Sequence, residues 1–134
     1  MEESAAVRQG ILDFYERFSA GDVDAFAAGI ADAPGVSVIG SAPGEGHDSR
    51  EDWIDAYRQG AAKGIRLEGE DPRGYEDGAM GWGTDRAAFV LPDGSRLSTR
   101  LTAVLRNEQG EWKVVHLHFS VGVPDEEAVQ PADA

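Results

Sequence analysis

Residues 100–120 read RLTAVLRNEQGEWKVVHLHFS, and this stretch decides the fold. Apolar and polar side chains largely alternate on both sides of Glu108-Gln109-Gly110, which is the period of a half-buried strand. A glycine-ended triplet between two such runs is typical of a hairpin whose three-residue loop ends on a left-handed glycine. The stretch therefore predicts two long antiparallel strands, over residues 95–107 and 111–121.

Two further turn signals lie upstream and extend the same pattern. Glu76-Asp77-Gly78 and Pro92-Asp93-Gly94 separate runs with a period of two, so strands are also predicted at 65–75 and 79–91. Together the four strands form a meander in which each strand pairs with the next.

If each triplet is the loop, the facing residues are fixed and the sheet separates into two faces. The face predicted to lie under helices carries Leu67, Gly69, Asp71, Gly83, Asp85, Ala87, Thr99, Leu101, Ala103, Val115, Leu117 and Phe119. The opposite face is predicted to carry Glu68, Trp82, Arg86, Arg100, Val104, Trp112, Val114, His116 and His118. This register puts Glu68 opposite Arg86, and an acid facing a base stabilises a cross-strand pair.

Three helices are predicted ahead of the sheet. Apolar residues recur at steps of three and four over residues 3–19, and Gly21 ends this first helix. Asp22 is placed to cap a short second helix. Ser49, with an acid three residues later, resembles the capping box of a third helix, which Gly64 stops.

A short strand at 36–39 and a glycine-rich loop at 40–48 connect the second and third helices. In that loop His47 lies beside Glu45, where the imidazole could gate a pocket or face water, and water is the preferred interpretation.

Small residues on the covered face suggest a cavity beneath the helices. Gly69, Gly81, Gly83, Ala87 and Ala103 cluster where the sheet would curve, and few side chains would fill the space there. The residues expected to line this pocket are Phe14, Phe18, Trp53, Tyr57, Leu67, Asp71, Ala87, Thr99, Leu101, Ala103, Leu117 and Phe119.

Asp85 is the candidate catalytic residue, because its carboxyl points into the same apolar face without an obvious basic partner. A polar group converging on an apolar concavity is the usual form of a small-molecule site. Two alternatives stay open: Asp85 is hydrated at the rim, or it makes a structural bond to a helix tyrosine such as Tyr15 or Tyr57.

Composition excludes several classes of protein. The 134 residues hold 25 acids and 12 bases, a net charge of −13, which argues against nucleic acid and anionic membrane surfaces as partners. There is no cysteine, so disulfides and thiolate catalysis are excluded. No signal peptide or spanning apolar run is evident, so a cytoplasmic protein is expected. One domain is predicted over 1–122, with a loose acidic tail over 123–134.

His116 and His118 have a spacing on one strand face that could serve a metal. No third ligand is evident on that face, so a hydrogen-bonded histidine pair is preferred. We therefore expect no metal and no cofactor.

Several segments resemble the nuclear transport factor two-like superfamily, also called the SnoaL-like or ketosteroid-isomerase-like fold. Residues 20–25, AGDVDA, are similar to its junction between the first two helices, and Gly40-Ser41 to its entry to the third. Residues 100–106 and 110–120 are very similar to the SnoaL-like group that includes the calcium/calmodulin-dependent protein kinase II association domain. The resemblance covers about residues 5–122.

The resemblance implies an α+β fold: a cone of three N-terminal helices on a curved antiparallel sheet of four long strands and one short strand. It also implies a homodimer through the uncovered sheet face, with Glu68, Trp82, Arg86, Arg100, Trp112, His116 and His118 at the contact, and a small apolar or polyketide-like ligand. The sequence gives a reason of its own for the dimer, because that face is partly apolar and partly charge-paired.

The resemblance also has departures. The isomerase pattern has a tyrosine where Phe14 stands and a general-base aspartate where Gly40 stands. Steroid isomerisation by that route is therefore not expected. The arginines that line the kinase association domain's pocket correspond to positions near Asp85, Ala103 and Phe119, so a carboxylate ligand held in that way is doubtful.

Three functions are compatible with these observations. The first is a small-molecule-binding domain with no assigned reaction. The second is an enzyme of the isomerase, cyclase or dehydratase kind that uses Asp85 as general acid or base. The third is an assembly module without catalysis, which a cavity too small for any ligand, combined with a higher ring oligomer, would favour.

Overall fold

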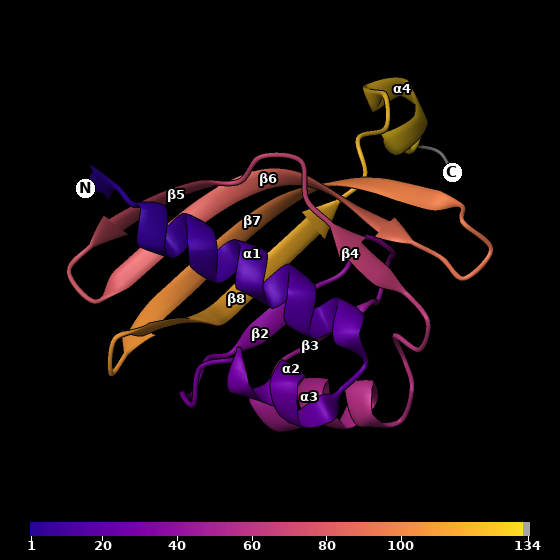
Figure 1. The fold of residues 1–134 in the computed structure, drawn as a ribbon. Helices are drawn as coiled ribbons and strands as arrows, with labels where there is room; N and C mark the ends of the chain where they lie inside the picture. The colour runs from indigo at the N-terminus through magenta and orange to yellow at the C-terminus, as the bar shows by residue number, and fades with distance from the viewer. Residues whose placement is uncertain (133–134) are drawn as a thin grey trace.

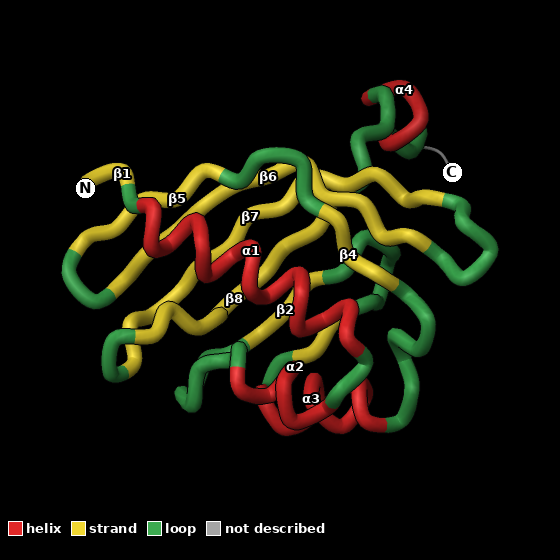
Figure 2. Tube along the Cα trace, in the orientation of Figure 1, coloured by secondary structure: helices red, strands yellow, loops and turns green. Residues whose placement is uncertain are grey.

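The computed structural model describes residues 1–132 and has a mixed α+β fold, in which the first three helices lie on one face of a curved sheet and a short fourth helix stands apart in the tail (Figures 1 and 2). The helices are α1 (Ala5–Ala20), α2 (Val23–Ala28), α3 (Arg50–Arg58) and α4 (Asp125–Ala128). The strands are β1 (Glu2–Glu3), β2 (Ser37–Ile39), β3 (Gly46–His47), β4 (Arg66–Glu68), β5 (Arg73–Asp77), β6 (Met80–Val90), β7 (Arg96–Glu108) and β8 (Glu111–Ser120). Figure 1 shows α1 crossing the sheet, with α2 and α3 grouped near the C-terminal end of α1.

The sheet order is β1-β5-β6-β7-β8-β2-β3, and β4 also pairs with β6. The β2–β8 pair is parallel, whereas the other named pairs are antiparallel. The predicted meander is therefore present, and it is extended at one edge by β1 and at the other by β2 and β3. The sequence analysis did not predict β1, β3 or the pairing partner of β2.

Local capping explains the helix starts. The Ser4 hydroxyl accepts a hydrogen bond from the Val7 N–H at 3.0 Å, the Asp22 carboxylate from the Asp24 N–H at 2.9 Å, and the Ser49 hydroxyl from the Asp52 N–H at 3.1 Å. The predicted caps of the second and third helices are confirmed by this geometry.

The helix ends follow the sequence less closely. Gly21 ends α1 with φ 76°, the left-handed conformation that glycine adopts without steric cost. The third helix ends at Arg58 and not at Gly64, and residues 59–64 form turns. The extra left-handed glycine at Gly60 (φ 91°) explains the earlier end.

The middle hairpin has the predicted register, but the other two do not. Asp85 faces Leu101 and Arg86 faces Arg100, as predicted. In the first hairpin the predicted strand breaks into β4 and β5, and Leu67 faces Phe89 in place of Ala87. Both outer hairpins have two-residue loops: Asp77 pairs with Met80, and Glu108 with Glu111.

A β-bulge between Val104 and Leu105 reverses the facing of side chains along β8. Leu105 faces Val114, which is buried in the core at 1% exposure. Trp112 packs on the same side, with its Cβ 3.0 Å from where a Cβ on Gly10 would lie. The prediction that Trp112 and Val114 lie on the uncovered face was therefore wrong. Val115 likewise does not face Ala103, because Leu117 takes that place.

The glycines under α1 do not leave a cavity, contrary to the prediction. A Cβ on Gly81 would lie 2.7 Å from Val7 Cγ2, and one on Gly83 would clash with Ile11. A Cβ on Gly74 would lie 2.5 Å from the Arg8 backbone nitrogen. The missing side chains let α1 approach the sheet closely, so that its own side chains fill the space.

The tail carries the short α4, all of whose residues are exposed. The predicted loose tail over 123–134 therefore includes one helical turn, and its last two residues, 133–134, lie outside the described residues. No helix within residues 1–132 has the length and apolarity needed to cross a bilayer.

Candidate functional site

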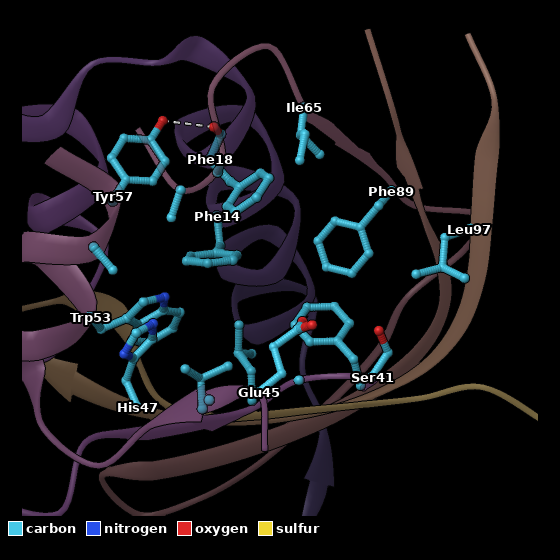
Figure 3. A pocket seen from close by; sticks show the side chains of 18 of the residues that line it. Phe14, Phe18, Ser41, Glu45, His47, Trp53, Tyr57, Ile65, Phe89 and Leu97 are labelled. Atoms are coloured by element: carbon cyan, nitrogen blue, oxygen red, sulfur yellow. Dashed lines mark hydrogen bonds between the residues drawn. The ribbon is translucent and has the colours of Figure 1, made fainter. Parts of the chain in front are cut away.

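A cavity of about 410 Å³ lies at the α3 end of the sheet, away from the glycines under α1 (Figure 3). Its wall combines residues of α1, α3, the connection around β2 and β3, and the ends of β6, β7 and β8. The lining residues are Phe14, Phe18, Val38, Gly40, Ser41, Glu45, Gly46, His47, Trp53, Ala56, Tyr57, Ala61, Ala62, Ile65, Phe89, Leu91, Leu97, Leu117 and Phe119.

Aromatic side chains in contact form much of this wall. The ring centroids of Phe14 and Trp53 lie 5.9 Å apart, and those of Phe18 and Phe89 lie 5.8 Å apart. Phe89 is also 4.8 Å from Phe119. Tilted and edge-on rings at such separations are favourable arrangements, so the wall is held in shape by its own packing.

Tyr57 lines the cavity, but its hydroxyl is already used. It donates a hydrogen bond to the Phe18 carbonyl oxygen at 2.7 Å (Figure 3). Burial of the phenol raises the pKa of Tyr57, a backbone hydrogen bond at Gly21 opposes this, and the nearby Asp22 carboxylate adds to it. The phenol therefore stays protonated and serves to join α3 to α1.

The polar part of the wall comes from the loop that contains β3. Ser41, Glu45 and His47 all line the cavity, and Figure 3 shows them on the side opposite Phe18 and Phe89. The loop closes on itself, because the Gly40 N–H donates to the Glu45 carbonyl oxygen at 2.9 Å. From the sequence His47 is expected to face water, whereas the structure places this half-buried imidazole in the cavity wall.

Glu45 is held close to the loop backbone at Gly40. A Cβ on Gly40 would lie 2.6 Å from Glu45 Cγ and 2.7 Å from Glu45 Cδ, so the glutamate side chain occupies the space that a side chain at position 40 would fill. Sequence reasoning missed Ser41 and Glu45 as site residues. The one sequence feature that could have indicated them is the presence of polar residues between Gly40 and His47. Their positions are defined only once β2 pairs with β3, and the sequence does not predict that pairing.

Half of the predicted pocket residues line the cavity. These are Phe14, Phe18, Trp53, Tyr57, Leu117 and Phe119. The structure does not place the others in its wall: Leu67, Asp71, Ala87, Thr99, Leu101 and Ala103. With the exception of the exposed Asp71, these are buried, because α1 packs directly over that part of the sheet.

Asp85 is buried beside α1 and does not line the cavity. Its carboxylate accepts hydrogen bonds from the Tyr15 hydroxyl at 2.8 Å and from the backbone N–H groups of Glu70, Asp71 and Arg86 at 3.2, 3.0 and 2.7 Å. This is the structural alternative considered for Asp85, with Tyr15 as the partner. A catalytic role of Asp85 stays an untested hypothesis.

The predicted contact residues other than Trp112 lie on the uncovered face. Arg86 and Arg100 face each other directly, but His118 faces Thr102, and Glu68 faces Ala88. The three predicted loops put Glu68, Arg86, Arg100 and His118 in one row across the sheet, whereas in the structure Glu68 and His118 are each displaced from that row by two residues. Glu68 forms ion pairs with Arg66 at 3.3 Å and Arg96 at 2.6 Å, and the hydrogen bond from Arg96 lowers the pKa of Glu68.

The two histidines of β8 have different surroundings. His116 Nδ1 lies 2.8 Å from the Ser37 hydroxyl oxygen, whereas His118 is exposed. They therefore do not form the hydrogen-bonded pair suggested by their spacing. Within residues 1–132 no group of three histidine or carboxylate side chains is arranged to hold a metal ion.

Comparison with known families gives one match that spans most of the chain. The model of the SnoaL-like domain matches residues 7–124. No curated protein matches the sequence.

Solved structures share the fold at low sequence identity. A nuclear transport factor two-like protein of unknown function from Pseudomonas putida has a TM-score of 0.73 at 16% identity, and the match covers 96% of this chain and 92% of that one. A Streptomyces avermitilis protein that has been proposed as a dehydratase of the same family has a TM-score of 0.72 at 19% identity, with coverage of 89% and 95%.

A third similar structure, from Thiobacillus denitrificans, has been proposed as a calcium/calmodulin-dependent protein kinase type II association domain. Its TM-score is 0.71 at 22% identity, with coverage of 85% of this chain and 93% of that one. At these identities the similarity shows the fold alone.

Proposed function

Because this chain belongs to the SnoaL-like domain family, whose model matches residues 7–124, we propose that it binds a small apolar molecule in the cavity beside α3. The observation that carries the proposal is a cavity of about 410 Å³ walled by aromatic and aliphatic side chains. Ligand pockets in proteins commonly measure about 300–1,000 Å³, are mostly apolar, and contain a few polar groups that orient the ligand.

The same cavity weighs against a pure assembly module. That function would need no internal space, and close packing is the ordinary state of a protein interior. Here the aromatic rings around Phe14 and Phe89 contact one another and still leave the cavity unfilled. No reaction is assigned to the site.

The proposal can be tested by filling the cavity. We expect an uncharged aromatic probe, 2-naphthylmethanol, to bind the wild-type protein in a calorimetric titration. Ala56→Leu adds a branched side chain to the cavity wall on α3 and should weaken binding about tenfold or more, because one lost contact of about 1.4 kcal/mol is a tenfold change in Kd.

Ala5→Leu is the matched control, because Ala5 is an exposed α1 residue outside the cavity wall. It should leave the Kd unchanged. The proposal is wrong if the wild-type protein binds neither 2-naphthylmethanol nor its amine analogue 2-naphthylmethylamine, or if Ala56→Leu weakens binding no more than Ala5→Leu does.

We further propose that two copies associate through the uncovered sheet face. Two features support this. Trp82 is stacked on Tyr75 with ring centroids 4.8 Å apart, and it remains exposed on that face beside Val104. Arg86 and Arg100 face each other, and among the described residues neither has an acidic partner. A second copy would cover the apolar residues and could supply carboxylates to these arginines.

A further inference from the structure

We propose that the ligand of this cavity carries a protonated amine on its apolar body, and that the Glu45 carboxylate binds this amine. The inference rests on the proposed function, because it requires that the cavity beside α3 binds a small molecule. It adds the chemical class of that molecule and the residue that selects it.

The first support is the position of Glu45. Its side chain lies over the Cα of Gly40, where a Cβ would be 2.7 Å from Glu45 Cδ, and it lines the cavity together with Ser41. Figure 3 shows Glu45 extending from the loop into the space bounded by the aromatic rings. The loop holds the backbone in place, since the Glu45 N–H donates to the Ala42 carbonyl oxygen at 3.1 Å and the Glu45 carbonyl accepts from Gly40.

The second support is that the carboxylate has no cation of its own. Within residues 1–132 the acids found in ion pairs are Asp55, Glu68, Asp71, Glu108 and Glu111. Glu45 is not among them, and no hydrogen-bond donor of the described residues reaches its side-chain oxygens. Its two oxygens are therefore free to accept hydrogen bonds from a ligand, and bonds to a charged donor are the stronger kind.

The third support is the sign of the charge around the cavity. Of the described lining residues, Glu45 is the one acid, and none is lysine or arginine. The whole chain has a net charge of −13, which attracts cations and repels anions at long range. A ligand carboxylate would meet this potential without any fixed cation to offset it.

The aromatic wall fits the same class of ligand. Phe14, Trp53 and Phe119 line the cavity, and an ammonium group is attracted to an aromatic ring face. An organic amine combines an apolar body for this wall with a cation for Glu45. An acid or an uncharged molecule would use only the wall.

Three matched probes test the inference: 2-naphthylmethylamine, 2-naphthylmethanol and 2-naphthoate. They share one ring system and differ in the charge of their substituent, which is positive, neutral and negative respectively. Glu45 is exposed, and an exposed ion pair contributes up to about 1 kcal/mol, so we expect the amine to bind about fivefold tighter than the alcohol and the acid to bind more weakly than both. Calorimetry at neutral pH measures all three Kd values.

Glu45→Gln removes the charge and keeps the size of the side chain. It should bring the amine and alcohol to nearly equal Kd values. Glu51→Gln is the matched control: it makes the same change of net charge at an exposed α3 residue outside the cavity wall, and it should preserve the preference for the amine.

The outcomes separate this inference from the function on which it rests. If the alcohol binds but the amine has no advantage over it, or if Glu45→Gln leaves the advantage unchanged, the inference is wrong and the proposed binding function stands. If none of the three probes binds, both proposals fail.

Discussion

The Asp85 carboxylate illustrates, at the residue scale, how one buried acid can take the place of missing strand pairing. Residues 69–72 lie between β4 and β5 and have no ladder partner on β6. The backbone N–H groups of Glu70 and Asp71 donate to Asp85 instead. Because backbone donors without a partner are costly, this carboxylate allows the strand to break without loss of hydrogen bonding.

Tyr15 completes this arrangement and provides a prediction for alkaline pH. Burial of the phenol, followed by its hydrogen bond to Asp85 and the charge of that residue, raises the pKa of Tyr15 far above 10.0, its value in an unfolded chain. Because the pKa of Tyr15 is higher in the folded protein, the protonated phenol contributes to stability in full at pH values below the pKa of the unfolded chain. This contribution is lost as the pH rises above that unfolded-state pKa toward the folded-state pKa.

We therefore expect Tyr15→Phe to change the pH dependence of stability. Above pH 10.0 the free energy of unfolding of the wild-type protein should fall by about 1.4 kcal/mol per pH unit more than that of the variant, because phenylalanine has no proton to lose. At pH 8 the variant should be about 1 kcal/mol less stable, owing to the lost hydrogen bond.

Urea denaturation between pH 8 and pH 11.5 measures both effects. If the free energies of unfolding of the two proteins changed in parallel with pH, Tyr15 would have the same pKa in the folded and unfolded states. In that case the burial of Tyr15 and its hydrogen bond to Asp85 would not raise the pKa of the phenol.

At the scale of elements, the packing of α1 on the sheet depends on glycines in β5 and β6. Gly74 and Gly83 face each other across these strands, and both lie against α1. The absence of Cβ atoms brings the helix close, so this part of the interior is filled. The sequence showed the glycines but not the approach of the helix, which is why the cavity was predicted in the wrong place.

Gly83→Ala tests this packing. The added Cβ would clash with Ile11 and with the Arg73 carbonyl oxygen, and overpacking of this kind costs about 1–3 kcal/mol. Gly122→Ala is the control, because the nearest atom to its Cβ would be 3.8 Å away, and its stability should change by less than about 0.5 kcal/mol. Thermal or urea unfolding measures both; equal stability of the two variants would contradict the close approach of α1.

The predictions that held depend on local chemistry. The caps at Asp22 and Ser49 and the left-handed Gly21 are local features, and sequence reasoning placed them correctly. The register of the two outer hairpins, in contrast, depends on loop length and on packing between strands, which local sequence does not determine. A two-residue and a three-residue loop differ by one residue, and the bulge at Val104 and Leu105 arises from packing across strands.

For the site, the sequence identified aromatic residues on α1 and α3. Helical spacing assigns Phe14 and Phe18 to one face of the first helix, and Trp53 and Tyr57 to one face of the third. It could not place Ser41, Glu45 or His47. Their positions depend on the pairing of β2 with β3 and with β8, which joins segments distant in the chain.

At the scale of the whole molecule, the helices on one face leave the other face of the sheet open, and the proposed dimer follows from this. We expect the wild-type protein to sediment at micromolar concentration as a species of twice its 14.3 kDa. Val104→Glu, on the uncovered face, should yield monomers, because association would bury a carboxylate without a partner.

Gln59→Glu adds the same charge at the exposed residue that follows α3, and this variant should remain dimeric. Sedimentation of the wild-type protein as a single 14.3 kDa species would refute the dimer. Dimeric Val104→Glu would instead mean that the copies meet at another surface.

The parallel pairing of β2 with β8 has a consequence for how the protein forms during synthesis. Ser37 and His116, which face each other in this pair, are separated by 79 positions in the chain. A ribosome therefore releases α1, α2, β2 and α3 long before β8 exists to hold β2 in place. The cavity wall is completed last, and until then the rings of Phe14, Phe18 and Trp53 lack the sheet that covers them, which leaves apolar surface exposed on the nascent chain.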